Sequence, residues 1–298
     1  MILNFFLCII LLIKYIHCYT ISSYTNNIRV FITGSNGVLG NKLVKNYLSD
    51  HGESSCDVIA SSRKTLDLLK LDNLIEFPVD DNFFHFNNEN EQHIILINNA
   101  AVCLSGNSND IKEETLLVNT IAPIKLSTLL YNDHRLYKNN KITIINISSG
   151  EGELIYLNTK IQSDIKDLQN INDLNNYINQ LYNKNIDNYN DSDNKIIEYA
   201  FGDTPWYSIS KALLNKFTIL KNDEEVNLLN HNKKNNMNIY SICPGDFISS
   251  MTSKYDKNNA ENNDINEIVQ NIIKISLNKE NLYQSGEFYN EKLQKILY

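Results

Sequence analysis

Short apolar runs rich in Ile and Val alternate along the chain with longer stretches in which apolar residues recur every three or four positions. The short runs predict strands at residues 28–32, 57–60, 93–97, 141–147 and 238–242. The longer stretches predict helices at residues 41–48, 66–77, 113–130, 208–220 and 265–275. Continuous apolar strands that alternate with helices are typical of a parallel sheet covered by helices on both faces. The pattern therefore predicts an α/β fold in a single domain over residues 28–298.

The first 27 residues differ from this pattern. Residues 2–13 are apolar except for Asn4, and a polar stretch follows at residues 20–27. A membrane-spanning helix needs about 20 apolar residues, so this shorter run favours a signal peptide over a span. An uncleaved signal anchor and a buried N-terminal segment remain alternatives, because no basic residue precedes the run and no clear cleavage site follows it. We expect residues 1–27 to be a signal peptide or anchor with a short spacer.

This N-terminal segment sets the expected location. We expect the protein in the endoplasmic reticulum or in an organelle reached through the secretory pathway, with membrane contact only through residues 1–27 if they are not cleaved. If the segment is not a signal, the protein would be cytoplasmic.

Composition narrows the classes of partner. The chain has 298 residues, a formal net charge of −8 and a pI near 5.3, which argues against binding to the phosphate backbone of nucleic acids. Asn is abundant, with 48 residues, whereas Arg (3), Ala (7) and Gly (10) are scarce, so the positions of the scarce residues are the informative ones. Outside the N-terminal segment, Cys56, Cys103 and Cys243 are too widely spaced for a disulfide framework or a metal cluster, and we expect no metal site.

Residues 154–198 form an Asn-rich segment with 11 Asn. Within it, apolar residues recur at intervals of three and four, which places them on one helix face. These residues are Ile161, Ile165, Leu168, Ile171, Leu174, Ile178 and Leu181. We expect an ordered helical insertion docked on the domain rather than a floppy loop. Asn190 begins a glycosylation sequon, which has meaning only if the chain is secreted.

A glycine-rich turn follows the first predicted strand. Gly34, Gly37 and Gly40 fall within seven residues at the start of the next predicted helix. Glycines let the backbone turn sharply and approach a pyrophosphate, whose charge is stabilised by unpaired amides at a helix N-terminus. We therefore predict a Rossmann-type doubly wound sheet that binds a dinucleotide. Arg63 follows the second predicted strand, where a basic side chain accommodates the 2′-phosphate of NADP, so we expect NADP(H) as cofactor.

Tyr207 and Lys211 lie four positions apart on a predicted helix, and therefore on one face. An ammonium group nearby favours the phenolate, and we expect it to lower the pKa of Tyr207 from about 10 toward the range of a general acid or base. In a chain with 17 Tyr and 24 Lys, this pair gains weight only from the motifs that accompany it.

Those motifs resemble a known superfamily. In chain order they are Thr33-Gly34, Asn98-Asn99-Ala100-Ala101, Asn119, Ser148-Ser149, Tyr207 with Lys211, and Pro244-Gly245. In this order they resemble the short-chain dehydrogenase/reductase superfamily over roughly residues 28–298. The interval of 58 positions from Ser149 to Tyr207 looks like the helical insertion of the monomeric NADPH-dependent carbonyl reductases. The resemblance therefore also implies a monomer.

The resemblance implies a role for each matching residue. Tyr207 would protonate a substrate carbonyl oxygen as hydride arrives from the nicotinamide, while Lys211 would hold the ribose and depress the Tyr207 pKa. Ser149 would hydrogen-bond the substrate oxygen, and Asn119 would anchor a water of the proton relay. The further cofactor contacts implied are Gly34, Ser35, Asn36, Gly37, Leu39, Gly40, Arg63, Asp67, Asn98, Ala100 and Ala101 around the adenosine and phosphates, and Pro244, Gly245, Phe247 and Ser249 around the nicotinamide.

Two features depart from the carbonyl reductase pattern. The glycine spacing is that of the extended branch of the superfamily, whereas the single-domain branch has its middle glycine where Val38 stands. Only 35 positions separate Arg63 from Asn98, so the second crossover helix and the strand after it are compressed. Asp67 is then the preferred contact to adenine, with Asp80 as the alternative.

We expect an NADPH-dependent oxidoreductase that reduces a ketone or aldehyde carbonyl to an alcohol by hydride transfer. Residues 102–109, the insertion and residues 250–259 would shape the pocket for this small-molecule carbonyl substrate. One alternative is an extended-branch nucleotide-sugar reductase or epimerase. The other is a catalytically silent NADP-binding partner protein.

Overall fold

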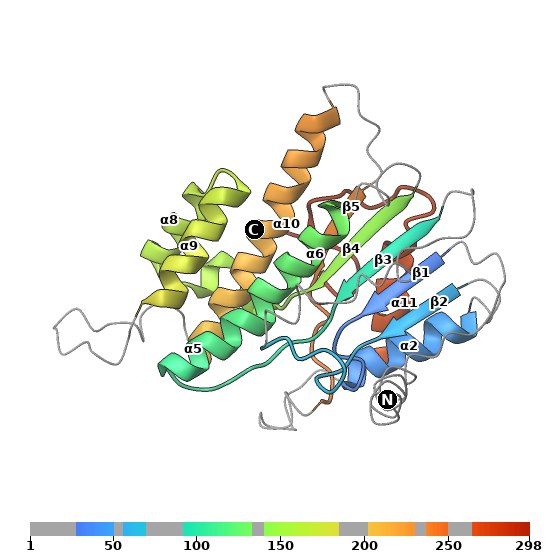
Figure 1. The fold of residues 1–298 in the computed structure, drawn as a ribbon, viewed down its shortest axis with the longest axis horizontal. Coiled ribbons are helices and arrows are strands. Elements are labelled where there is room, and N and C mark those ends of the chain that lie inside the picture. Colours follow the sequence, from blue (N-terminus) through green and yellow to red (C-terminus); the bar gives the residue numbers. More distant parts are fainter. Residues whose placement is uncertain are drawn as a thin grey trace, which may run out of the picture.

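The computed structural model describes residues 28–50, 56–69, 92–132, 140–184, 202–229, 237–249 and 264–298. Within them, seven strands form one sheet in the order β2-β1-β3-β4-β5-β6-β7, of which the part from β2 to β5 is labelled in Figure 1. The strands are β1 (Ile28–Ile32), β2 (Cys56–Ala60), β3 (His93–Asn98), β4 (Lys141–Ile147), β5 (Met237–Ile242), β6 (Phe288–Tyr289) and β7 (Lys295–Ile296). All neighbours pair in parallel except β6 and β7. The predicted doubly wound parallel sheet is confirmed.

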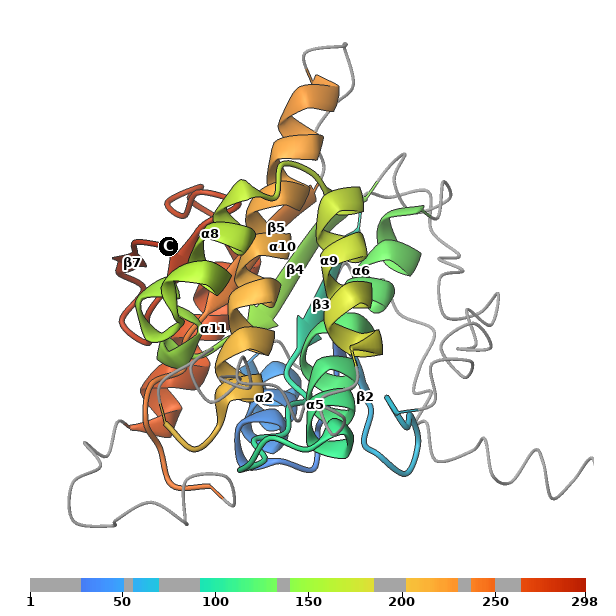
Figure 2. The same ribbon diagram turned by 90° about the vertical axis from the view of Figure 1, so that its left-hand side faces the viewer.

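Helices cover both faces of the sheet (Figure 2). The α-helices are α2 (Val38–Asp50), α5 (Asn109–Leu116), α6 (Ala122–Asn132), α8 (Thr159–Asp167), α9 (Ile171–Asn183), α10 (Pro205–Leu229) and α11 (Ile265–Leu277). Side chains of each strand alternate between two cores, because successive residues of a strand point to opposite faces. Val30 and Ile32 pack with α2 and α11, whereas Phe31 belongs to the core that includes α5, α6 and α10.

The topology fixes where a ligand can bind. The chain leaves β1 to build β2 on one side and then crosses to β3 on the other. In open α/β sheets, ligands bind beyond the carboxyl ends of the strands at such a switch point. The turns after β1, β3, β4 and β5 therefore meet at this edge, and they contain most of the residues that the sequence motifs select.

The predicted insertion is helical, but its helix is broken. All seven apolar residues of the predicted stripe are buried in the core shared with α10. The chain leaves the helix at Leu168, which has extended backbone angles, and starts α9 after Asn170, whose side chain accepts a hydrogen bond from the Asp173 amide at 2.9 Å. α8 and α9 therefore replace a single helix, and α9 packs against α10 and α5.

Two other predicted helices differ from the structure. The helix expected at residues 113–130 runs from Asn109 to Asn132 and contains a π-helical turn, Leu117–Ile121. The helix expected from residue 66 does not begin there: Leu66 closes a turn by donating to the Ser62 carbonyl at 2.8 Å, and the Asp67 carboxylate accepts from the Leu69 amide. Side-chain capping by Asp67 competes with the helix that the apolar spacing predicts.

Several predictions fall outside the described residues. They concern residues 1–27, the rest of the helix expected at 66–77, Asp80, the end of the insertion with Asn190, and residues 250–259. In the part of the chain that the structure describes, none of the helices is both long and apolar enough to span a membrane.

Candidate active site

The turn after β1 is closed by steric contacts that only glycine permits. Gly34 has a φ of +67°, and a Cβ there would lie 2.8 Å from the Cα of Ala100. A Cβ on Gly40, in the first turn of α2, would collide with the Gly34 carbonyl oxygen and lie 2.7 Å from the Asn99 amide nitrogen. The loop thus packs backbone on backbone in front of the N-terminus of α2. A cradle of this kind fits the pyrophosphate of a dinucleotide.

Asn99 holds this loop in place, a role that the sequence motifs did not assign to it. Its Nδ2 donates to the carbonyl oxygens of Thr33 at 2.8 Å and Gly34 at 3.1 Å. In return, the Thr33 hydroxyl accepts from the amides of Asn99 and Ala100, each at 3.0 Å. The turns after β1 and β3 are therefore joined by four hydrogen bonds. In the sequence, the only indication of this role for Asn99 is that it follows a second asparagine, Asn98, at the end of a predicted strand.

The neighbouring predicted contact Asn98 points elsewhere. Its side chain is buried and donates to the Asn146 side-chain oxygen on β4 at 2.8 Å. Asn146 donates in turn to Thr218 of α10 at 3.0 Å, and Thr218 pairs with Ser241 of β5 at 2.8 Å. Asn98 therefore begins a polar chain through the core. Its side chain is directed away from the loop edge, where Ala100 lies against Gly34.

The other predicted contacts of the loop lie in different environments. Asn36 and Gly37 are exposed in front of α2, and the Ser35 amide donates to the Ser61 carbonyl at 2.8 Å, which ties the loop to the end of β2. Leu39 is buried among the residues under α2 and α11. A cofactor in the cradle would meet the exposed residues directly, and Leu39 only through its backbone.

Arg63 stands at the end of β2 with an exposed side chain. It forms ion pairs with Asp67, 3.9 Å away, and with Glu114 of α5, 3.7 Å away. Both predicted adenosine-side residues, Arg63 and Asp67, are therefore neighbours at the rim of the cradle. The pairs are long and the guanidinium is 68% exposed, so they contribute little stability.

Tyr207 and Lys211 lie in the first two turns of α10, both buried. The Lys211 ammonium lies 5.7 Å from the centroid of the Tyr207 ring and donates to the Ile147 carbonyl at the end of β4, at 2.7 Å. Pro205 opens the helix, and Tyr207 and Ser208 close its first turn onto the Thr204 carbonyl. The helix start therefore fixes both side chains against the end of β4.

Burial dominates the acid–base properties of this pair. Desolvation raises the pKa of the Tyr207 phenol well above its usual value, and the hydrogen bond with Ser149 opposes this only in part. The pKa of Lys211 is lowered to about 8 because the ammonium is desolvated. The expected lowering of the Tyr207 pKa is wrong for the protein alone, because desolvation outweighs any attraction to a single neighbouring charge. Tyr207 consequently keeps its proton at neutral pH.

Ser149 follows β4 and meets Tyr207. Its hydroxyl hydrogen-bonds the Tyr207 phenol and accepts from the Glu151 amide at 3.2 Å. Ser148, its neighbour, is buried, and its hydroxyl has no hydrogen-bond partner within the described residues. Of the two serines, Ser149 is the one that the structure brings to Tyr207, as the motif comparison predicts.

Asn119 lies in the π-helical turn and is fully buried. Its side chain exchanges two hydrogen bonds with the backbone of Val102, at 2.9 and 2.8 Å, and donates to the Ser210 hydroxyl on α10 at 3.1 Å. Asn119 therefore connects the loop after β3 to α10. Both amide hydrogens of Asn119 are therefore used within the protein, and neither is available to the predicted relay water.

The turn after β5 completes the edge. Gly245 has a φ of +65°, and its amide donates to the Cys243 sulfur at 3.4 Å. Pro244 is buried, and Phe247 packs partly into the core under α11. The thiols of Cys243 and of Cys103, after β3, both influence the pKa values of Tyr207 and Lys211. The structure thus brings the nicotinamide-side turn next to the Tyr207 cluster, and Ser249 ends the described part of that turn.

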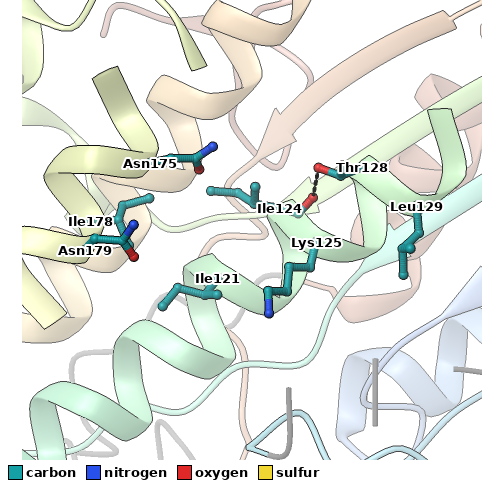
Figure 3. Close-up of a pocket in the computed structure, with 8 residues that line it drawn as sticks. All are labelled: Ile121, Ile124, Lys125, Thr128, Leu129, Asn175, Ile178 and Asn179. Atoms are coloured by element: carbon teal, nitrogen blue, oxygen red, sulfur yellow. Dashed lines mark hydrogen bonds between the residues drawn. The ribbon is translucent and has the colours of Figure 1, made fainter. Parts of the chain in front are cut away.

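A separate pocket of about 530 Å³ lies between α6 and α9. Ile121, Ile124 and Ile178 line the apolar wall of this pocket (Figure 3). Thr128, which also lines the pocket, donates a hydrogen bond to the Ile124 carbonyl at 2.8 Å. The pocket contains none of the predicted site residues. It is therefore distinct from the site at the carboxyl edge of the sheet.

Structural comparison finds several reductases of similar fold. Salutaridine reductase from Papaver somniferum is 19% identical with a TM-score of 0.64, over 89% of this chain and 99% of that chain. NADPH-bound carbonyl reductase from chicken fatty liver is 19% identical with a TM-score of 0.54, over 92% and 100%. Menthone neomenthol reductase from Mentha piperita is 14% identical with a TM-score of 0.61, over 90% and 99%.

At these identities the comparison shows the fold alone, and this fold is the one that the resemblance to short-chain dehydrogenases and reductases predicts. No protein-family model matches the sequence, and a search of curated proteins finds no match either.

Proposed function

We propose that this protein is an NADPH-dependent oxidoreductase that reduces a ketone or aldehyde to an alcohol, with Tyr207 as the proton donor. The observation that carries the proposal is the convergence of Ser149, Tyr207 and Lys211 at the same sheet edge as the glycine cradle. The solved structures of the same fold include NADPH-bound proteins, which supports a nicotinamide cofactor.

The residues present suit this chemistry. Bound NADPH would supply hydride to the carbonyl carbon, and the cradle with the N-terminus of α2 would hold its pyrophosphate. Tyr207, which is protonated at neutral pH, would give its phenolic proton to the carbonyl oxygen. The Ser149 hydroxyl would orient the same oxygen. The Lys211 ammonium would stabilise the phenolate that Tyr207 becomes until a proton returns from solvent.

Arg63 supports the preference for NADPH. Its exposed ion pairs with Asp67 and Glu114 are weak, whereas a phosphate dianion offers a bidentate, charge-assisted contact to a guanidinium. A 2′-phosphate at the rim of the cradle would therefore displace these carboxylates.

Oxidation of NADPH against a panel of ketones and aldehydes tests the proposal. Tyr207→Phe removes the donated proton and should lower kcat by about 10² to 10⁴-fold while leaving NADPH binding intact. Tyr283→Phe, at a tyrosine between α11 and β6, is the matched control and should keep wild-type kcat. Cofactor binding without turnover of any carbonyl by the wild type would contradict the proposal and favour a silent NADP-binding protein.

The glycine spacing favours a second candidate, an extended-branch reductase or epimerase that acts on nucleotide sugars. Val38, which stands where the single-domain branch has glycine, opens α2 with a side chain 43% exposed. Turnover of a nucleotide sugar, together with inactivity on simple carbonyls, would establish this candidate in place of the first.

We also propose that the protein is a monomer with an N-terminal secretory leader. The packing of α9 over α5 and α10 supports the first part, since the insertion of the related monomeric reductases covers the surface that shorter relatives use to dimerise. The apolar run at residues 2–13 supports the second. Localisation of the tagged full chain tests the leader. Finding the tagged protein in the cytosol would contradict it.

A further inference from the structure

Four turns converge on Tyr207, and their charge is of one sign. Ser149 hydrogen-bonds the Tyr207 phenol, and the thiols of Cys103 and Cys243 both affect its pKa. The Gly106 amide donates to the Asp203 carbonyl, and the Trp206 indole donates to the Asn107 side-chain oxygen. Residues of the turns 102–107, 149–153 and 243–249 therefore lie near the phenol, and residues 202–204, directly before α10, bond to the first of these turns. These four described turns contain the carboxylates Glu151, Glu153, Asp203 and Asp246 and no Lys or Arg.

Glu151 is the carboxylate that acts on Tyr207 itself. Its charge raises the pKa of the phenol, which places it close to the proposed proton donor. One of its oxygens, Oε2, accepts from the Ser208 hydroxyl at 3.1 Å and from the Thr204 hydroxyl at 3.2 Å. Both hydroxyl-bearing residues are buried, Thr204 directly before α10 and Ser208 in its first turn. The carboxylate is thus fixed by the same helix that positions Tyr207.

The charge of Glu151 is not neutralised within the described residues. None of the ion pairs there involves Glu151, and the residue itself is exposed. Its two partners are neutral hydroxyls, which hold the carboxylate but leave its charge. An oriented, uncompensated carboxylate beside the reacting group attracts cations and repels anions.

We propose that Glu151 is a specificity-determining residue that selects carbonyl substrates carrying a protonated amine. This inference rests on the proposed reductase function and names its substrate class. A substrate whose carbonyl oxygen meets Ser149 and Tyr207 places its ammonium group toward the Glu151 carboxylate and the acidic turns around it. A carboxylate in the same place of the substrate is disfavoured by the same charges.

Three ketones of nearly equal size and different charge test the inference. They are 1-methyl-4-piperidone in its protonated form, neutral 4-methylcyclohexanone and anionic 4-oxocyclohexanecarboxylate. We expect kcat/KM to fall by about tenfold at each step from cation to neutral to anion, in line with one charge acting across a few ångströms of partly solvated space. Higher salt should narrow these ratios, because it screens the interaction.

Glu151→Gln isolates the charge. Glutamine keeps an acceptor for Ser208 and Thr204, so the preference for the cation should fall by about tenfold while kcat/KM for the neutral ketone stays near wild type. Glu280→Gln removes the same charge at an exposed site in the turn after α11. It should change neither the ratio of kcat/KM between the cation and the neutral ketone nor that between the neutral ketone and the anion. Equal kcat/KM for all three ketones in the wild type, or ratios unaffected by Glu151→Gln, would overturn the inference and leave the reductase proposal intact.

Binding measurements keep the two proposals separate if turnover fails. The three ketones are titrated calorimetrically into the NADPH-loaded wild type and into Glu151→Gln. Tighter binding of the cation by the wild type alone supports the selection by Glu151 even without turnover, which would contradict only the reductase function. Equal binding of the three ketones by the wild type contradicts the selection.

Discussion

Substitution of Gly40 by Ala tests the cradle directly. The added Cβ would collide with the Gly34 carbonyl oxygen and come within 2.7 Å of the Asn99 amide nitrogen. Overpacking of this kind costs about 1–3 kcal/mol, and displacement of Asn99 removes at least one of its hydrogen bonds, worth about 1 kcal/mol. The higher helix propensity of Ala returns about 1 kcal/mol. The free energy of unfolding should therefore fall by about 2 kcal/mol.

Two measurements check this value. Thermal unfolding should show a Tm lower by roughly 4–8 °C, and NADPH binding by fluorescence should weaken by at least about tenfold, because the displaced carbonyl lies in the turn that would approach the pyrophosphate. Gly37→Ala is the matched control for the Tm, since its Cβ would meet only the Gly34 oxygen, at 3.3 Å, and its φ is not in the left-handed region. A Gly40→Ala protein with the Tm and NADPH affinity of wild type would refute the assignment of the cradle.

Three further predictions concern cofactor preference, acid stability and assembly. Arg63→Ala should reduce the ratio of kcat/KM with NADPH to that with NADH by about tenfold, and an unchanged ratio would contradict its contact with the 2′-phosphate. Burial lowers the pKa of His93 from 6.5 to about 3, so the unfolded chain takes up a proton below pH 6.5 that the folded chain refuses. The stability that His93 contributes is complete above pH 6.5 and lost toward pH 3. In urea titrations of the wild type, the free energy of unfolding should therefore fall by about 2 kcal/mol from pH 7 to pH 5 because of this residue. His93→Gln should lose correspondingly less, and equal losses in the two proteins would argue against it. Light scattering should give the mass of one chain, whereas a stable dimer would contradict the monomer.

The strands were predictable from the sequence because runs rich in β-branched apolar residues favour buried strands over other secondary structure. The run at residues 141–147 is β-branched at five of its seven positions, four of them Ile, and β4 has these bounds. Such runs bury both faces, so composition and length suffice. The helical stripe of the insertion was predictable for the same reason, since its seven apolar positions are all buried.

The details that failed depend on contacts between distant residues. The break between α8 and α9 comes from capping by Asn170, which resembles the many other Asn of the segment. The inward direction of Asn98 depends on Asn146, 48 positions away. The pKa of Tyr207 depends on how completely the fold excludes water, which the spacing to Lys211 does not show. In each case the local pattern was correct and the partner was supplied by the tertiary structure.

The π-helical turn at Leu117–Ile121 has a consequence for how this chain can tolerate length changes. Its backbone closes with an Ala122 amide bonded to the Leu117 carbonyl, one residue farther than in an α-helix. Deletion of one residue there would leave a regular α-helix joining α5 to α6, at no cost in backbone hydrogen bonds. The deletion would, however, rotate the preceding part of the helix by about 100° relative to α6. Asn119 would then leave Val102 and Ser210. The surplus residue is therefore a spacer that sets the angular position of Asn119, and its removal should yield a folded protein whose loop after β3 is detached from α10.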